Sequence, residues 1–567
     1  MAQIQIQRHI TDTRAFFKKH ITPNRSIAAC FGLLALLLNT HDVGTTSVWY
    51  DEAWSYALSN QSLHTMYYYI WGPFQNMALY YVLLHFWLHF LQFMQIHPTE
   101  LLLRLPSVLA ASAGTAIVYL FGARFFSRTA GIVAASVTLA DSLQLYGAQQ
   151  ARAYGLQMLL LVCAWYALFS AFSALAESHR NRWWLAYAVL MALAINTHLF
   201  SIMVWAAQLA VIGVVLVAPG QWRDRTRASL RVIAASMVLI SVSIVPIIYA
   251  SKKFGGASTW IPIPKLSDIY NFVLVPLTNF NTTFSVVLTL LVGVALLIPL
   301  LAPVPALQTL IQRPSPTIKQ APTGDLDATL KRAVVHAQAA ELPDRKFQVF
   351  RDPQLGVWLI ACWFVIPIVL SFVLSLPLIN LHLFYRRYLM VCVPPMAILA
   401  GIGVAVLRPL IPRIALAMVV IFLGAMAIPT FYSESQLADF RTTTQWVQAH
   451  YQPGDGVACY PVLACSLGVN YYFEVYPGPA HFDANSPGIW NWPAYTAVYD
   501  PANPVTPLIP YSTTHKRVFL FYGPINLVPG SIEDNSFHAA QQWLQTHGTF
   551  IASYQSQIDS VYLYDMP

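Results

Sequence analysis

Long apolar runs constrain the fold of this chain more than any other feature. Runs of roughly 15–24 residues recur from near residue 26 to residue 430. An apolar helix of about 20 residues is long enough to cross a bilayer. Only 10% of the 567 residues are charged, against about 25% in soluble domains. The chain is therefore predicted to be a polytopic α-helical membrane protein.

Charge placement predicts the topology of these segments. Cytoplasmic loops of membrane proteins are enriched in lysine and arginine. With eleven spans, 22 of the 32 lysines and arginines fall inside. The N-terminus (1–25) and the loop 306–353 are then cytoplasmic, and the C-terminal region is extracytoplasmic. The eleven predicted spans are 26–41, 103–122, 130–147, 154–176, 185–197, 199–217, 229–249, 284–304, 355–378, 388–407 and 413–430.

One further apolar segment, residues 77–95, is predicted to lie in the membrane interface. If it crossed the membrane, every later loop would change side and the charge bias would vanish. Its polar residues Tyr81, His85 and His89 recur at helical spacing and form one stripe. A helix with one polar stripe suits the boundary between lipid and water.

Residues 431–567 differ in composition from the apolar region before them and are predicted to form a separate extracytoplasmic α/β domain. They are polar and rich in proline and glycine, with short strand-like runs. Predicted strands are 456–460 and 517–522, predicted helices are 436–450 and 536–547, and 549–564 alternates like a closing hairpin or an edge strand. Cys459 and Cys465 have a spacing that permits a disulfide without requiring one.

Two adjacent acids, Asp51 and Glu52, open the first outer loop, about residues 42–102. Loops of this length are usually functional. Carboxylates at a membrane surface are costly and tend to mark function. The membrane domain 26–430 is therefore predicted to carry an active site at its outer face.

Several basic residues on the predicted outer face run against the topological trend and need another reason. Lys252-Lys253 and Arg386-Arg387 are paired cations at the outer ends of spans. They could hold a phosphate, or they could reach lipid head groups. Arg152, in the turn between two spans, could pair with an acid of the first loop or cap its own helix.

The order of short motifs resembles that of the GT-C membrane glycosyltransferases, in particular the glycosyltransferase family 39-like branch that includes protein O-mannosyltransferases and lipid A aminoarabinose transferases. The resemblance is clear over about residues 45–220 and again near 385–395. Its motifs are Asp51-Glu52, Leu79-Tyr80-Tyr81, Leu103-Arg104-Leu105-Pro106-Ser107, Gly122-Ala123-Arg124-Phe125-Phe126-Ser127-Arg128, the turn from Tyr146 to Tyr154, Thr197-His198-Leu199-Phe200, and Arg387-Tyr388-Leu389.

The resemblance implies a GT-C fold and an inverting enzyme that takes sugar from a polyprenyl-phosphate donor at the outer membrane face. The family's acid in the first loop corresponds to Asp51, with Glu52 its neighbour, and the family's Arg-Tyr-Leu element corresponds to Arg387-Tyr388-Leu389. Two departures stand out. The family often has His-Pro-Pro before the Leu-Tyr-Tyr helix, where this chain has Pro73-Phe74-Gln75-Asn76, and often has glutamate where Gln150 stands. The second departure removes a carboxylate and leaves more of the base chemistry to Asp51.

We therefore predict an inverting glycosyltransferase of the plasma (inner) membrane. An inverting transfer needs one carboxylate base and stabilisation of the departing phosphate. Asp51 and Glu52 are the predicted catalytic residues. Asp51 is the predicted base, whereas Glu52 could orient Arg152, bind a metal or cap a helix. The predicted partners are the donor lipid, a lipid, glycan or protein acceptor and membrane lipids, but no nucleic acid. Predicted substrate-binding residues are Tyr81, His85, Arg152, Tyr154, His198, Lys252, Lys253, Arg386, Arg387 and Tyr388.

Two alternatives stay open at the level of sequence. A divalent metal is one, because Asp51, Glu52, His85, His89 and His198 could meet, although local spacing defines no third ligand; no metal ligand is assigned. The other is a transporter or flippase for a lipid-linked substrate. A transporter predicts repeated halves and charges deep within spans, and neither pattern is evident.

Overall fold

The computed structural model describes most of the helical region and most of the C-terminal region of the chain. The N-terminus up to residue 21, the loop 306–352 and the Pro73-Phe74-Gln75 segment lie outside the described residues. The described residues are 22–72, 76–254, 261–271, 281–301, 353–407, 409–434, 439–460, 462–492, 496–497, 503–523, 532–556 and 559–567.

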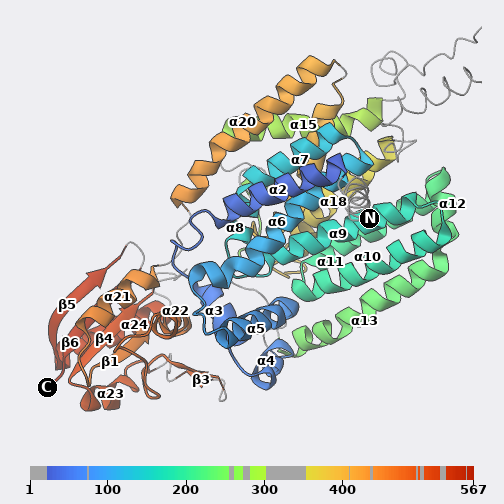
Figure 1. Ribbon diagram of the computed structural model, residues 1–567. Coiled ribbons are helices and arrows are strands. Elements are labelled where there is room, and N and C mark those ends of the chain that lie inside the picture. Colours follow the sequence, from blue (N-terminus) through green and yellow to red (C-terminus); the bar gives the residue numbers. More distant parts are fainter. Residues whose placement is uncertain are drawn as a thin grey trace, which may run out of the picture.

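Helices that run side by side form the larger portion of the molecule (Figure 1). A smaller domain with strands lies at one end, and the three short helices of the first outer loop lie next to it. The elements of the bundle are α2 (Pro23–Thr40), α6 (Glu100–Phe125), α7 (Arg128–Ala140), α8 (Ser142–Ala148), α9 (Tyr154–Ser173), α10 (Glu177–Thr197), α11 (Ser201–Val217), α12 (Gln221–Arg227), α13 (Leu230–Phe254), α14 (Leu266–Ile269), α15 (Thr282–Leu301), α18 (Pro353–Leu374), the 3-10 helix η4 (Tyr388–Cys392), α19 (Val393–Ala405) and α20 (Leu410–Glu434).

Six helices among the described residues are long and apolar enough to cross a membrane. The bent pair α11 and α12 would make a seventh if it were one span, although the two helices meet at 109°. A helical membrane protein is thereby confirmed. All eleven predicted spans fall on helices, but length and composition support only six or seven, so the count of eleven stays a prediction.

The helix boundaries correct two of the predicted spans. The predicted span 130–147 is two helices, α7 and α8, because Asp141 ends the first and caps the second by accepting from the Gln144 amide at 3.0 Å. Helix α10 begins at Glu177, eight residues before the predicted start of its span. The break at residue 198 between α10 and α11 was predicted correctly.

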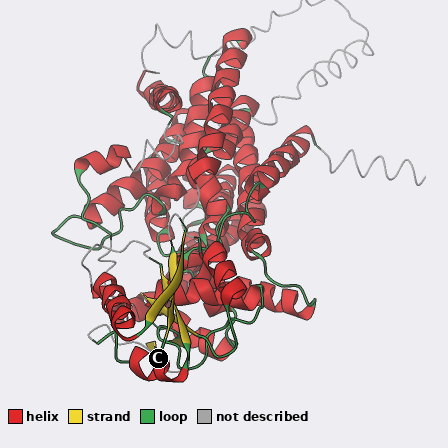
Figure 2. Cartoon of the chain, turned by 90° about the vertical axis from the view of Figure 1, so that its left-hand side faces the viewer, coloured by secondary structure: helices red, strands yellow, loops and turns green. Residues whose placement is uncertain are grey.

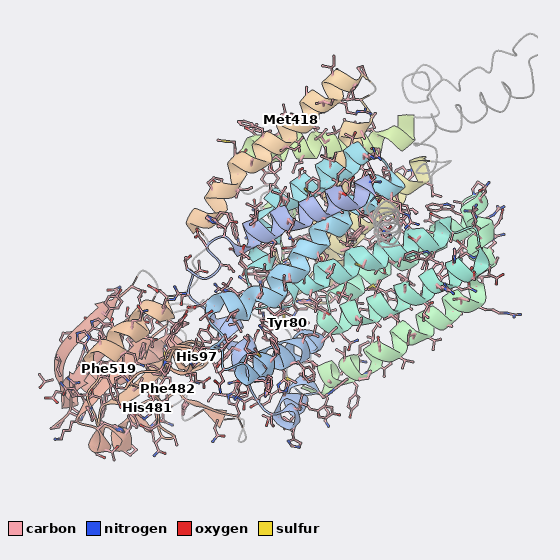
Figure 3. All side chains as sticks on the ribbon, in the orientation of Figure 1. Tyr80, His97, Met418, His481, Phe482 and Phe519 are labelled. Atoms are coloured by element: carbon pink, nitrogen blue, oxygen red, sulfur yellow. A yellow bond between two sulfur atoms is a disulfide. The ribbon has the colours of Figure 1, made fainter. Side chains whose placement is uncertain are left out.

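Small residues let the bundle helices approach closely. A Cβ added to Gly122 of α6 would lie 2.7 Å from the Cα of Gly131 on α7. Close backbone contact of this kind replaces the hydrophobic driving force that is missing within a bilayer. Large apolar side chains instead point outward on α20, where Ile411, Met418 and Phe422 are exposed (Figure 3 labels Met418), as suits a helix that faces lipid.

The first outer loop folds into three short helices, α3 (Tyr50–Ser59), α4 (Leu63–Ile70) and α5 (Ala78–Phe93). Helix α5 is the segment predicted to lie in the interface. It buries Tyr80, whose hydroxyl lies 2.8 Å from Ser107 Oγ of α6, and Figure 3 shows Tyr80 at the side of the bundle. Its other face exposes Phe86, Phe90 and Phe93. The predicted helix is confirmed, and its place in the interface stays a prediction.

The C-terminal region contains a four-stranded mixed sheet packed with helices, so the α/β character predicted for it is confirmed (Figure 2 shows the strands in yellow). The sheet has the order β1-β4-β6-β5, in which β1 and β4 are parallel and the other neighbours antiparallel. The elements are α21 (Phe440–His450), β1 (Gly456–Tyr460), α22 (Val462–Val475), β2 (Trp490–Asn491), β3 (Thr496–Ala497), α23 (Leu508–Thr514), β4 (Arg517–Tyr522), α24 (Ile532–His547), β5 (Thr549–Gln555) and β6 (Ser560–Asp565).

A buried carboxylate joins this domain to the helical bundle. Glu100, in the first turn of α6, is 1% exposed. It accepts from Arg441 Nε at 2.8 Å, from the Tyr472 hydroxyl at 2.9 Å and from the Tyr476 hydroxyl at 2.6 Å. Arg441 also donates to the Gly44 carbonyl of the first outer loop. Because a buried charge must keep its partners, these contacts hold the sheet domain in one position over the outer loop.

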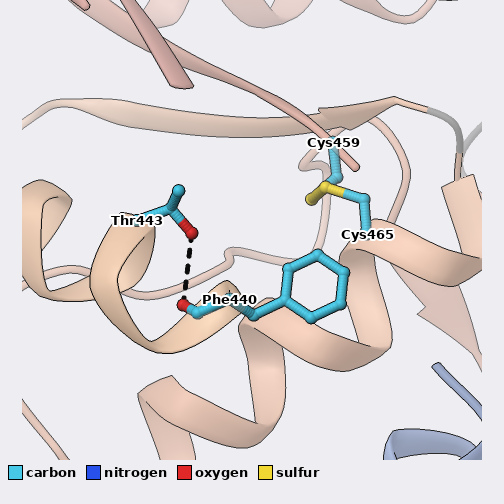
Figure 4. The surroundings of a disulfide bond; sticks show 4 residues. All are labelled: Phe440, Thr443, Cys459 and Cys465. Carbon is cyan, nitrogen blue, oxygen red and sulfur yellow. Dashed lines mark hydrogen bonds between the residues drawn. A yellow bond between two sulfur atoms is a disulfide. The ribbon is translucent and has the colours of Figure 1, made fainter. Parts of the chain in front are cut away.

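A disulfide joins Cys459 and Cys465, the pair whose spacing left the question open (Figure 4). It connects the end of β1 to the first turn of α22, the helix that carries Tyr472 and ends directly before Tyr476. Phe440 of α21 lies beside the same helix, where its ring would meet a Cβ on Gly468.

Replacing both cysteines by serine is expected to destabilise this domain by about 2 kcal/mol, because the disulfide closes a loop of only six residues in the unfolded chain. Thermal unfolding of the purified protein with and without reductant measures the effect. The variant should be insensitive to reductant, whereas the parent should lose stability. Equal unfolding temperatures for parent and variant would contradict the prediction.

The stability of the sheet domain should also depend on Asp559. This residue is buried, and burial raises the pKa of its carboxyl to about 7. The folded state then binds the proton more tightly than the unfolded chain, so this group's contribution to stability falls as pH rises from about 4 to 7. An Asp559→Asn variant keeps an acceptor for the Asp439 amide. Its gain in unfolding temperature should grow from pH 5 to pH 7 and then level off; a gain that shrinks with rising pH would contradict this.

Candidate active site

The two acids of the first outer loop lie in the first turn of α3 but in different surroundings. Helix α3 begins at Tyr50, directly before them. Carboxylates near a helix N-terminus are stabilised by the helix dipole. Because neighbours on a helix do not face the same side, Glu52 is fully buried, whereas the Asp51 side chain is 16% exposed. The sequence placed the acids together, and the fold separates their roles.

Glu52 forms a buried, two-pronged ion pair with Arg104 of α6. Its Oε1 accepts from Arg104 Nε at 2.8 Å and its Oε2 from Nη2 at 2.6 Å. Oε1 also accepts from the Ala151 amide at 2.7 Å, and Oε2 from the Trp49 amide at 3.4 Å. The last contact is the helix cap considered for Glu52 from the sequence. With both oxygens engaged, this carboxylate has no free face for a substrate.

Arg104 is as fully engaged as its partner. It is 2% exposed. Its Nη1 donates to the carbonyls of Val43 and Thr46 at 2.6 and 3.0 Å, and its Nη2 donates to the Ser47 carbonyl at 3.0 Å. The loop before α3 is therefore wrapped around one guanidinium. From the sequence this arginine had no predicted role beyond its place in the motif at 103–107; a charge inside the apolar start of a span was the signal for a buried partner.

Asp51 faces two other arginines. Its Oδ2 lies 3.0 Å from Arg387 Nη1 and 3.7 Å from Arg152 Nη2. Arg152 also donates to the Asp51 carbonyl at 3.2 Å, to Ser55 Oγ at 3.3 Å and to the Tyr81 hydroxyl at 3.3 Å. Of the two interpretations left open for Arg152, the structure shows pairing with an acid of the first loop. Residues 51, 152 and 387, far apart in sequence, meet here.

The two adjacent arginines before η4, Arg386 and Arg387, lie in different surroundings. The Arg387 side chain is 14% exposed and lies 5.6 Å from the Trp49 ring and 5.2 Å from the Tyr385 ring. Arg386 is exposed. Tyr388, the next residue, packs its ring 5.2 Å from that of His198. The predicted cluster therefore includes Arg387 and Tyr388, while Arg386 points away from it.

His198 and Tyr154 line the inner side of the same group. Their rings lie 5.7 Å apart, and both side chains are buried. Burial, assisted by the charges of Arg152 and Arg387, lowers the pKa of His198 well below its usual range. His198 is therefore a neutral imidazole beside two cations.

Three predicted residues lie apart from this group. Lys252 and Lys253 are exposed in the last turn of α13. His85 is buried, with Nδ1 2.9 Å from the Ser59 carbonyl. The described side-chain contacts of the Asp51 carboxylate are to Arg152 and Arg387, and these three residues are not among them.

Metal ligands do not converge in the described region of the chain. Among these residues there is no group of three or more histidine, cysteine, aspartate or glutamate side chains arranged to hold an ion. The ring centroids of His85 and His89 lie 4.0 Å apart with the rings tilted, and Nδ1 of each lies close to a backbone carbonyl. The question of a metal stays as the sequence left it.

Residues 82–249 match the family model described as dolichyl-phosphate-mannose-protein mannosyltransferase. This segment is less than half of the chain, and the match shows what the segment is similar to. It covers Arg104, Arg152 and His198, whereas Asp51 and Arg387 lie outside the matched segment. No curated protein matches the chain by sequence.

The fold of the chain is similar to those of solved structures. ArnT from Cupriavidus metallidurans in the apo state has a TM-score of 0.57 at 13% identity, over 96% of this chain and 98% of that one. ArnT bound to undecaprenyl phosphate has a TM-score of 0.55 at 13% identity, over 95% and 98%. The oligosaccharyltransferase AglB from Archaeoglobus fulgidus has a TM-score of 0.48 at 12% identity, over 96% and 74%.

The predicted resemblance to GT-C glycosyltransferases is thereby confirmed. The predicted enzyme class, a membrane glycosyltransferase that uses a polyprenyl-phosphate-linked sugar, is confirmed with it. At 13% identity the likeness to ArnT shows the fold alone, so the roles of individual residues rest on the geometry above.

The geometry predicts that the two acids respond differently to loss of charge. Glu52→Gln leaves the buried Arg104 guanidinium without its counter-charge, which costs about 3–5 kcal/mol. Asp51→Asn removes a charge that is partly exposed, so its effect on folding should be much smaller. Yield after detergent extraction and the unfolding temperature of the two variants measure this. Equal stability of both variants would contradict the structural role of Glu52.

Proposed function

We propose that this protein is an inverting glycosyltransferase in which Asp51 is the catalytic base. The observation that carries the proposal is the Asp51 carboxylate itself. It is partly exposed and lies 3.0 Å from the guanidinium of Arg387. The adjacent Glu52, by contrast, has both oxygens engaged within the protein. Asp51 is therefore the acid of the pair that can reach a substrate.

In the proposed reaction, Asp51 accepts the proton of an acceptor hydroxyl. The hydroxyl oxygen attacks the anomeric carbon of the donor from the face opposite the phosphate, and a new glycosidic bond forms. The bond between the anomeric carbon and the phosphate oxygen breaks, and polyprenyl phosphate leaves with the bonding pair. One carboxylate is enough for such an inverting transfer.

Arg387 is proposed to hold the donor phosphate. A guanidinium can bind a carboxylate and a phosphate at once because it presents five donors in a fixed plane. Arg387 next to Asp51 would thus bring the leaving group and the base to one site. Positive charge placed where negative charge develops lowers the barrier to the transfer. Arg152, which donates to the Asp51 backbone and to Tyr81, is proposed to orient the base.

The remaining predicted residues have supporting proposals. The inner side of the proposed donor site is lined by Tyr154, Tyr388 and His198. Its side formed by α5 is lined by Tyr81. The exposed bases Arg386, Lys252 and Lys253 are proposed to meet anionic lipid head groups or the donor lipid outside the site. His85 is proposed to act only through the position of α5, since it is buried against α3.

The arrangement of the chain in the membrane follows from the same proposal. The active site faces outward, with the N-terminus and the loop 306–353 in the cytoplasm. Residues 26–430 form the catalytic membrane domain, with eleven crossings, and residues 431–567 form an extracytoplasmic domain. The C-terminal domain is attached to the bundle through Glu100 and Arg441, which supports its location directly over the outer loop. The acceptor, a lipid, glycan or protein, then reaches Asp51 from this side.

Replacing Asp51 by asparagine is expected to lower kcat for sugar transfer by about 100-fold or more, since general-base catalysis contributes on that order. Arg387→Gln should lower the rate and also weaken donor binding, because it removes the phosphate contact. Release of polyprenyl phosphate from labelled polyprenyl-phosphate hexose, measured with an envelope fraction as acceptor, reports the rate.

The matched control is Asp42→Asn, which removes an exposed acid of the same outer loop and should leave the rate unchanged. Full activity of Asp51→Asn would contradict the assignment of the base. A purified protein that moves donor lipid across a bilayer without breaking the sugar–phosphate bond would support the transporter alternative and overturn the proposed function.

A further inference from the structure

His198 presents one polar atom that the rest of the chain does not use. It lies between α10 and α11 and is 2% exposed. Its Nε2 is buried and has no hydrogen-bond partner among the described residues. A buried polar atom without a partner costs about 1–3 kcal/mol. A buried imidazole nitrogen in this position calls for a ligand.

The backbone determines which kind of group Nε2 is. The Phe200 amide donates to His198 Nδ1 at 3.2 Å. A neutral imidazole has one donor and one acceptor nitrogen. Because Nδ1 accepts, Nε2 carries the hydrogen, and this nitrogen needs an acceptor.

The surroundings determine the charge of the ring and of its ligand. Tyr154, Tyr388, Arg152 and Arg387 are the titratable and charged groups that act on it or pack against it. The two guanidiniums disfavour a third positive charge, so the imidazole stays neutral. The same two cations attract an anion. A ligand that is an anion and accepts hydrogen bonds has the chemistry of a phosphate.

We propose that His198 donates its Nε2–H to an oxygen of the donor phosphate and thereby completes the phosphate site at Arg387. The inference rests on the proposed function and extends it. Arg387 contributes positive charge to the site. His198 contributes a hydrogen-bond donor of defined direction, because the Phe200 amide determines which of its two nitrogens carries the hydrogen. A neutral donor also holds the leaving phosphate equally well across the physiological pH range. Neither the proton nor the charge of His198 changes in the reaction.

The experiment compares three ligands: undecaprenyl phosphate, undecaprenol without phosphate, and inorganic phosphate. The full-length protein in lipid nanodiscs is used, with variants His198→Phe, which keeps a ring but loses the donor, and His198→Gln, which keeps an N–H donor. The exposed His547 on α24 serves as the control His547→Phe. Unfolding temperatures show whether each variant is folded.

Undecaprenyl phosphate should bind His198→Phe about tenfold or more weakly than the parent, since a hydrogen bond to a charged group is lost. His198→Gln should stay within about threefold, and the control should be unchanged. Undecaprenol should bind the parent and the His198 variants alike. The ratio of the parent and Phe affinities should be the same at pH 6 and pH 8. Competition by inorganic phosphate alone, lost in the Phe variant, would identify a phosphate site that does not need the lipid tail.

Several outcomes would overturn the inference. Equal affinity of the parent and His198→Phe, or a Gln variant as weak as the Phe variant, would remove the donor role. A parent affinity that strengthens at pH 6 only when His198 is present would show a cationic imidazole instead. If the parent does not bind undecaprenyl phosphate at all, the proposed function itself fails, and that result is distinct from the others.

Discussion

The buried ion pair of Glu52 and Arg104 is the interaction on which the rest of the site depends. It joins the first turn of α3 to α6, and through the Ala151 amide it also holds the turn that carries Arg152. The carbonyls of the preceding loop complete the coordination of the guanidinium. Such a pair is stable only while both charges and their hydrogen bonds are present. The position of Asp51 is therefore set by a residue that does not touch the substrate in the proposed reaction.

A second buried carboxylate, Glu100, has a similar anchoring role and lies one helical turn before Arg104 on α6. It holds Arg441 and two tyrosines of the sheet domain. One end of one helix thus anchors both the first outer loop and the sheet domain. The proposed catalytic carboxylate, Asp51, lies in the outer loop that is anchored in this way, and its side chain remains partly exposed. Rigid support for a partly exposed acid is the arrangement that a positioned base requires.

Adjacent residues of this chain repeatedly serve different purposes. Asp51 meets two arginines while Glu52 is buried with another, and Arg387 enters the site while Arg386 is exposed. Residue type and motif order could not separate these pairs. On helix α3 each residue is turned about 100° from the one before, so Asp51 and Glu52 leave in different directions. Arg386 and Arg387 lie in the turn before η4. Which direction leads to a partner depends on helices that lie hundreds of residues away.

Much of the fold could be predicted from local pattern. Apolar length predicted the helices, and strand-like runs predicted strands β1 and β4. The alternation at 549–564, interpreted as a closing hairpin or an edge strand, corresponds to the antiparallel pair β5 and β6. One exception in the bundle was the predicted span 130–147, where Asp141 divides the segment into two helices. Hydrophobicity summed over a window does not register a single capping residue, and a cap is what ends a helix.

The sequence by itself determined that this is a helical membrane protein with an α/β domain, and it predicted that Asp51, Arg152 and Arg387 take part in its chemistry. It could do so because periodicity, apolar length and motif order are properties of neighbouring residues. The tertiary structure alone decided that Arg104 neutralises Glu52, that Arg387 rather than Arg386 faces Asp51, and that His198 keeps an unused donor. Those outcomes depend on contacts between residues up to 336 positions apart, which no local pattern records.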